Sequence, residues 1–269
     1  MKTFARLKRI LFAAPLLLLL LTMQGCVHYY YGPNSNNMPL LKSKGDVNIS
    51  GGLTVSGDGH ALSNRSSGFE LQSAFGLSNH VGAMVNFYSA SGGEKTTNSG
   101  GSTPNYKDNG SGSYIEGGLG YFTTVNSSDV IFEVYGGVGK GSVTNNYSLG
   151  ETSKVSVQKL FLQPSIGFII GPGLEFGLAS RFSSVQIKPT LNTIHPDSND
   201  YDAVNELARH TNHFFWEPGF LIRGGSKQVK FQLQWTYSKE KGQHRYVTQR
   251  GVLALGMLLR LPGSGKIKN

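Results

Sequence analysis

Apolar and polar residues alternate strictly along most of the chain after residue 45. The segment 69–77 is the clearest example. One of its faces carries Phe69, Leu71, Phe75 and Leu77. The other carries Glu70, Gln72, Ala74 and Gly76. Because successive side chains of a β-strand point to opposite faces, this pattern predicts strands with one apolar and one polar face.

Ten segments repeat this alternation, and most have the roughly 9–11 residues that a tilted strand needs to cross a bilayer. They lie near residues 46–56, 68–78, 80–90, 113–123, 129–140, 154–170, 173–187, 212–224, 228–238 and 246–261. Tight turns alternate with longer polar loops, the longest being Ala90–Gly112 and Lys188–Thr211. This layout is typical of an outer-membrane barrel. The sequence therefore predicts an all-β fold: a single up-and-down antiparallel transmembrane β-barrel of about ten strands over residues 45–262, with a tail at 263–269. The one helix candidate is Asp202–Leu207.

The residues on the two faces indicate which one meets lipid. Aromatic residues gather near the strand ends of the apolar faces, as in the girdles of membrane barrels. At the loop end they are Phe69, Phe87, Phe182, Trp216, Trp235 and Tyr237, and at the turn end Phe75, Tyr121, Phe132, Phe168, Phe176 and Phe231. We therefore expect the apolar faces to point outward and the polar faces to line the lumen.

The polar faces carry a set of acids and bases that would form a charge network in the lumen. Its predicted members are Glu70, Glu116, Glu133, Lys159, Glu175, Arg181, Glu217, Arg223, Lys230 and Arg250. Pairing is expected because an unpaired buried charge is costly. The register places Glu175 beside Arg223, with Arg181 and Glu217 one layer up. A ten-stranded barrel is narrow, so we expect a plugged lumen, with interior glycines making room for the long side chains.

The amino-terminal residues predict export. A basic start precedes an apolar run from Ile10 to about Leu21, which is shorter than the ~20 residues of a spanning helix and typical of a secretory signal, here residues 1–25. The sequence Thr22-Met23-Gln24-Gly25-Cys26 resembles the lipobox of bacterial lipoproteins. This resemblance implies that Cys26, the only cysteine, becomes the lipidated amino terminus, and Val27 after it implies sorting to the outer membrane.

Residues 26–44 are predicted to be a lipidated periplasmic tether, with Tyr29–Tyr31 resting at the inner-leaflet interface, where tyrosine is favoured. An even number of strands puts both chain ends on one side. Short turns belong on the periplasmic side, so the lipid anchor is expected there too.

The mature chain as a whole resembles lipid-anchored outer-membrane β-barrel proteins of Gram-negative bacteria. The stretch 29–53, with Pro-Asn, Pro-Leu-Leu and Lys-Gly-Asp, looks like the entry of uncharacterised barrel lipoproteins. The resemblance implies outer-membrane lipid as a partner, a monomer, and a structural or surface-contact role in which an extracellular ligand is reached through the loops.

Charge and motifs argue against other function classes. Four of the nine net positive charges, Lys2, Arg6, Lys8 and Arg9, fall in the acid-free signal, which leaves +5 without a clustered basic face, so nucleic-acid binding is not expected. The stretch Gly136–Ser142 lacks the spacing of a phosphate-binding loop. His195–Asp202 lacks the glycine and terminal glutamate of a calcium loop. We therefore expect no cofactor and no metal.

Two alternatives remain open. His210 and His213 lie near Glu217 at the loop end, where a rim hydrolase acting on lipid or peptide would place its acid–base groups. The chain shows no Ser-His-acid arrangement, so a non-enzyme is the leading prediction. The other alternative is a soluble periplasmic β-barrel lipoprotein with an apolar ligand in a dry centre, since alternation alone also fits a soluble sheet.

Overall fold

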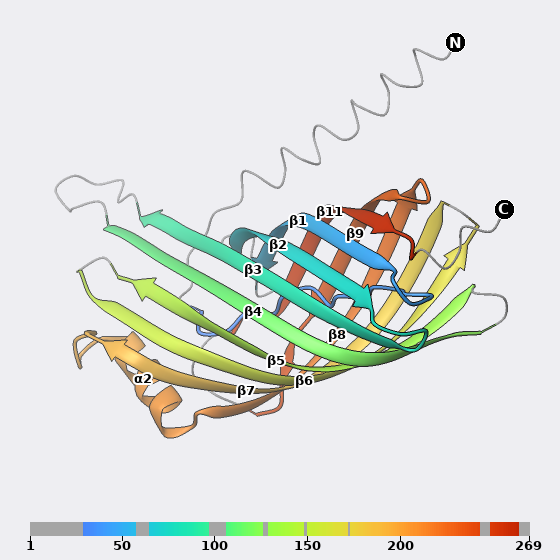
Figure 1. Cartoon of the computed structure of the whole chain (residues 1–269). Coiled ribbons are helices and arrows are strands. Elements are labelled where there is room, and N and C mark those ends of the chain that lie inside the picture. Colours follow the sequence, from blue (N-terminus) through green and yellow to red (C-terminus); the bar gives the residue numbers. More distant parts are fainter. Residues whose placement is uncertain are drawn as a thin grey trace, which may run out of the picture.

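The computed structural model describes residues 29–57, 65–96, 106–125, 129–147, 150–171, 173–242 and 248–263. Figure 1 shows long tilted strands wrapped into a barrel. They are β1 (Val47–Gly57), β2 (Arg65–Gly76), β3 (Val81–Thr96), β4 (Tyr106–Val125), β5 (Val130–Asn146), β6 (Thr152–Ile170), β7 (Leu174–Asn192), β8 (Asn212–Gly225), β9 (Val229–Tyr237) and β11 (Gly251–Leu261). The two-residue strand β10 (Lys239–Glu240) pairs with β8, and the helix α2 spans Asn199–Arg209.

The strand pairing closes the sheet on itself. Each strand from β1 to β8 pairs antiparallel with the next, and β11 pairs with both β1 and β9. The last pairing, β8 with β9, completes the circle. The predicted antiparallel barrel of about ten strands is therefore confirmed.

The barrel has two unlike ends. The connections after β2, β4, β6 and β8 are tight, and β1 begins and β11 ends beside them, so we call this the turn end. We call the opposite end, where the other connections lie, the loop end. The helix α2 lies at the loop end beside β7 (Figure 1). It contains the predicted helical stretch 202–207, which confirms that prediction. No helix within the described ranges is long and apolar enough to cross a membrane.

The outside of the barrel is apolar. Phe231 is 69% exposed, Leu119 63% and Phe75 44%, while Lys230 and Gln232 on either side of Phe231 are buried. A fully solvated protein would bury such residues, whereas a bilayer solvates them. The outward direction predicted for the apolar faces is confirmed. The soluble alternative needed an apolar centre, and its prediction for these side chains is wrong.

Several strands are longer than the sequence predicted. The stretch 90–112 was expected to be a loop, yet β3 continues to Thr96 and β4 begins at Tyr106. This part of the hairpin consists largely of Ser, Gly, Asn and charged residues. Above the membrane both faces of a strand meet polar surroundings, so the sheet continues without the apolar alternation that marks it lower down.

Candidate functional site: the barrel lumen

Residues 29–46 pass through the inside of the barrel, and we call them the threaded segment. At the loop end, Tyr29 O accepts a hydrogen bond from Asn145 Nδ2 (3.2 Å), and Tyr31 forms an isolated β-bridge with Thr248. At the turn end, Gly45 N donates to Gly76 O (2.8 Å). All residues from 29 to 41 are buried except Gly32, which is partly buried. The segment therefore runs the length of the lumen, from the loop end to the turn end.

This course differs from the predicted periplasmic tether. Tyr30 and Tyr31 are 2% and 1% exposed, so the prediction that Tyr29–Tyr31 rests at a lipid interface is wrong. The physical reason is that the tyrosine hydroxyls find partners inside the barrel. Tyr30 Oη lies 2.9 Å from Tyr147 Oη, and Tyr31 Oη donates to Glu217 Oε1 at 2.7 Å.

Glycines of the barrel wall let the threaded segment lie close to the strands. A Cβ atom on Gly167 would lie 2.2 Å from Leu40 Cδ2, and one on Gly177 would lie 2.9 Å from Met38 Sδ. Leu40 itself adopts φ 54°, in the left-handed region that branched apolar residues rarely occupy. The interior glycines were predicted to make room for long wall side chains, and at these two positions they make room for the threaded segment.

Four charged side chains of the wall meet near the middle of the lumen, and we call them the central charge cluster: Glu116, Lys159, Arg181 and Glu217. Lys159 Nζ lies 3.2 Å from Glu116 Oε1 and 3.1 Å from Glu217 Oε2. Arg181 Nη1 lies 3.7 Å from Glu116 Oε2. All four side chains are almost fully buried. Two acids thus balance two bases, which is the condition under which buried charges are tolerated.

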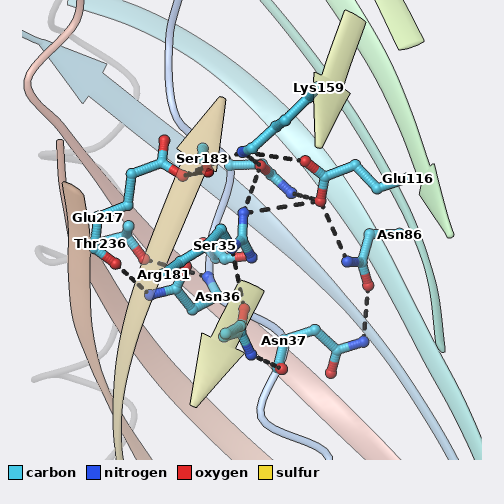
Figure 2. A network of polar contacts seen from close by, with 12 residues as sticks. Ser35, Asn36, Asn37, Asn86, Glu116, Lys159, Arg181, Ser183, Glu217 and Thr236 are labelled. Atoms are coloured by element: carbon cyan, nitrogen blue, oxygen red, sulfur yellow. Dashed lines mark hydrogen bonds and ion pairs between the residues drawn. The ribbon is translucent and has the colours of Figure 1, made fainter. Parts of the chain in front are cut away.

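The threaded segment supplies further hydrogen bonds to this cluster, beside those from wall residues such as Ser183 and Asn86 (Figure 2). Asn34 Nδ2 donates to Glu116 Oε2 (2.8 Å), and Asn34 Oδ1 accepts from Arg181 Nη1 (3.0 Å). Arg181 Nη2 also donates to the carbonyl of Ser35 (3.3 Å). The arrangement joins the segment to β4, β7 and β8, so segment and wall form a single hydrogen-bonded unit.

A second group of charges lies nearer the turn end, and we call it the turn-end charge cluster: Glu175, Arg223, Lys230 and Arg260. Glu175 and Arg223 are paired residues of β7 and β8, and Arg181 and Glu217 pair in the same ladder, as predicted. Arg260 binds Glu175 with both Nη atoms (2.5 and 3.1 Å), and Lys230 Nζ lies 3.6 Å from Glu175 Oε1. The cluster borders a cavity of about 630 Å³ at the turn end.

Arg260 was missed in the sequence analysis, although a signal for it was present. Leu259 and Leu261 on either side are 43% and 47% exposed, so alternation directs Arg260 inward. The same alternation fails for Arg250, whose side chain is exposed, so its predicted place in the lumen network is wrong. The strand β11 begins only at Gly251, and Gln249 is the residue that points inward there, donating to Ser66 Oγ (2.6 Å).

Glu70 and Glu133 are buried on the lumen side, and Glu133 Oε1 accepts a hydrogen bond from Leu41 N of the threaded segment (3.1 Å). Cys26 and the predicted signal 1–25 lie outside the described residues.

The histidines of the hydrolase alternative do not assemble with Glu217. His213 is buried, with Nδ1 2.8 Å from Glu240 Oε1, whereas His210 is exposed. Glu217 is bound by Tyr31, Lys159 and Ser183. A general acid–base pair needs its groups within hydrogen-bond reach of each other or of a substrate, and Glu217 has its bonds directed into the lumen instead.

No protein-family model and no curated protein matches this chain. Among solved structures, it is similar to the attachment invasion locus protein Ail of Yersinia pestis in complex with the heparin analogue sucrose octasulfate (15% identity, 81% of this chain and 99% of Ail, TM-score 0.38). It is also similar to an outer-membrane channel from Pseudomonas putida F1 (10%, 85% and 100%, TM-score 0.38) and to the P. putida toluene transporter TodX (7%, 88% and 97%, TM-score 0.26). Similarity of this degree says nothing about function, and the fold assignment rests on the strand pairing.

Proposed function

We propose that this chain is a non-enzymatic outer-membrane barrel that does not conduct, because its own threaded segment fills the lumen, and that it acts by contact at its loop end. The burial of residues 29–41 inside the barrel is the observation that carries this proposal. A ten-stranded barrel has little free space inside, and a polypeptide hydrogen-bonded to three strands takes up much of what remains. The exposed apolar exterior supports insertion in a bilayer.

The lipid anchor at Cys26 remains part of the proposal, but on the other side of the membrane from the one predicted. Only two residues lie between Cys26 and Tyr29, so their Cα atoms are three residue steps apart, a span of at most about 11 Å even when extended. Tyr29 lies at the loop end, whereas β1 begins at the turn end. Short turns face the periplasm in barrels of this type. We therefore place the anchored amino terminus at the cell surface, together with the loops.

Conductance in a planar bilayer tests the closed lumen. The purified wild-type protein should give no steady current, whereas a variant lacking residues 30–41 should conduct. A variant shortened by the tail 264–269 serves as a control and should stay silent. Heat-modifiability on a gel establishes that each variant is folded.

If the deletion variant does not fold, a protease site placed at exposed Lys44 allows the segment to be cut at the turn end after assembly. The cut protein is then treated with denaturant, at a concentration below the unfolding midpoint of the barrel, to remove the cut segment from the lumen. The treated protein should then conduct. Large steady currents from the intact wild-type protein would overturn the proposal.

A further inference from the structure

A small pocket lies at the loop end, between the threaded segment and strands β3, β4 and β5. Its lining includes the rings of Tyr29, Tyr88 and Tyr114 and the polar side chains of Ser66, Asn145 and Gln249. No Asp, Glu, Lys or Arg lines it among the residues that the structure describes. The pocket is partly open and has a volume of about 50 Å³. This is room for a few waters or for one edge of a sugar ring, with the rest of the ligand outside.

Two polar atoms of this lining have unused hydrogen-bonding capacity. Asn145 Oδ1 is buried and makes no hydrogen bond within the described ranges. The Tyr114 hydroxyl is also buried; its oxygen faces the backbone of Gly32 in the threaded segment, and its proton has no acceptor in the part of the chain that the structure describes. Other polar atoms of the lining already have hydrogen-bond partners: Asn145 Nδ2 donates to Tyr29 O, and Gln249 Nε2 donates to Ser66 Oγ. Buried polar atoms are normally paired, so an acceptor and a hydroxyl left over in one pocket indicate a place for a ligand that both donates and accepts.

The chemistry of the lining selects among ligand classes. Tyrosine rings offer apolar faces with polar tips, which suit a molecule that has C–H surfaces and hydroxyl groups. A sulfated or phosphorylated ligand would need cations, and a fatty chain would leave the amide and hydroxyl groups unpaired. Neutral sugar rings satisfy both conditions.

We propose that this pocket binds the terminal ring of a neutral saccharide presented at the outer mouth of the barrel. The proposal rests on the loop-end contact role proposed above and names the chemical class of the contact. Its failure is distinguishable from a failure of the proposed closed lumen, since conductance does not depend on sugar binding.

Saturation-transfer NMR tests the pocket on the full-length protein in dodecylphosphocholine, a detergent without a sugar headgroup. The probes are neutral oligosaccharides of hexoses and N-acetylhexosamines and, for comparison, a heparin-type sulfated oligosaccharide. At least one neutral probe should bind, and more tightly than the sulfated one. Tyr114→Phe removes the buried hydroxyl while keeping the ring, and should weaken binding about tenfold.

The matched control is Tyr121→Phe, the same change on the outer surface near the turn end, where Tyr121 is 53% exposed. It should bind as the wild type does. A second variant, Ala90→Leu, fills the pocket from β3 and should abolish the signal. Preference for the sulfated probe, absence of binding by every neutral probe, or equal affinity of the Tyr114→Phe and Tyr121→Phe variants would each overturn the proposal.

Discussion

Tyr31 donates its hydroxyl proton to Glu217 across 2.7 Å, although 186 residues separate the two in sequence. Glu217 belongs to β8 and also accepts from Lys159 and Ser183. The ring of Tyr31 packs on Phe215 of the same strand, with ring centroids 4.4 Å apart. Tyr31, which was predicted to lie outside the barrel, thus supplies one of the hydrogen bonds to a buried carboxylate inside it. Folding of the wall and placement of the amino terminus are therefore coupled.

The first prediction concerns this hydrogen bond. Tyr31→Phe keeps the ring packing and removes one donor to a buried charge, so we expect a loss of about 2 kcal/mol in the free energy of unfolding. The matched change Tyr88→Phe removes hydrogen bonds to neutral groups only, chiefly the one with Ser56 Oγ (2.9 Å), and should cost about 1 kcal/mol. Urea unfolding followed by the fluorescence of Trp216 and Trp235 gives both values. Equal losses would contradict the role assigned to the charge of Glu217.

A second prediction tests the central charge cluster. Arg181→Met leaves Glu116, Asn34 and Ser35 without a shared donor and should destabilise the protein by about 3–5 kcal/mol. Adding Glu116→Gln to that variant removes one of the stranded charges, so the double variant should lose less than the sum of the two single variants. The same urea series measures this coupling. Arg250→Ala, at an exposed position, is the control and should change stability by no more than about 0.5 kcal/mol.

The sequence predicted the inward or outward direction of the wall side chains well because alternation is a local property. Each residue of a strand points to the opposite face from its two neighbours. Glu175 and Arg223, or Arg181 and Glu217, could be placed opposite each other from alternation and turn length alone. The prediction fails where the ladder stops, as at Arg250, since alternation has meaning only within a paired strand.

The threaded segment could not be predicted in this way. Residues 29–41 have no regular period, and their asparagines and prolines favour irregular backbone, which is also what a tether would show. Their position depends on hydrogen bonds to residues far along the chain, such as Asn34 to Glu116 and Tyr31 to Glu217. The number of inward-facing glycines could have indicated that something besides the predicted charged side chains fills the lumen.

A third prediction tests the membrane-facing exterior. Leu160 is 60% exposed and pairs with exposed Val138, in the middle of β5 and β6. Leu160→Arg places a charge in hydrocarbon and should cost about 2–4 kcal/mol in folding into lipid vesicles. Leu191→Arg is the same substitution on an exposed side chain at the loop end of β7, beyond the lipid, and should cost about 1 kcal/mol or less. Equal costs at the two positions would contradict the membrane assignment of the exterior.

The fourth prediction concerns the side of the membrane on which the mature chain begins. The threaded segment enters the lumen at the loop end through Tyr29 and reaches the turn end at Gly45, so the two ends of this segment open on opposite sides. An epitope tag inserted between His28 and Tyr29 should bind antibody on intact cells. The same tag appended after Asn269 should bind only after the outer membrane is permeabilised, because β11 ends at the turn end beside β1. If the amino-terminal tag also required permeabilisation, both chain ends would lie on the same side of the membrane, and both the passage of residues 29–46 through the lumen and the surface position of the anchor would be wrong. If the two tags exchanged their behaviour, the barrel would be inserted with its loop end toward the periplasm.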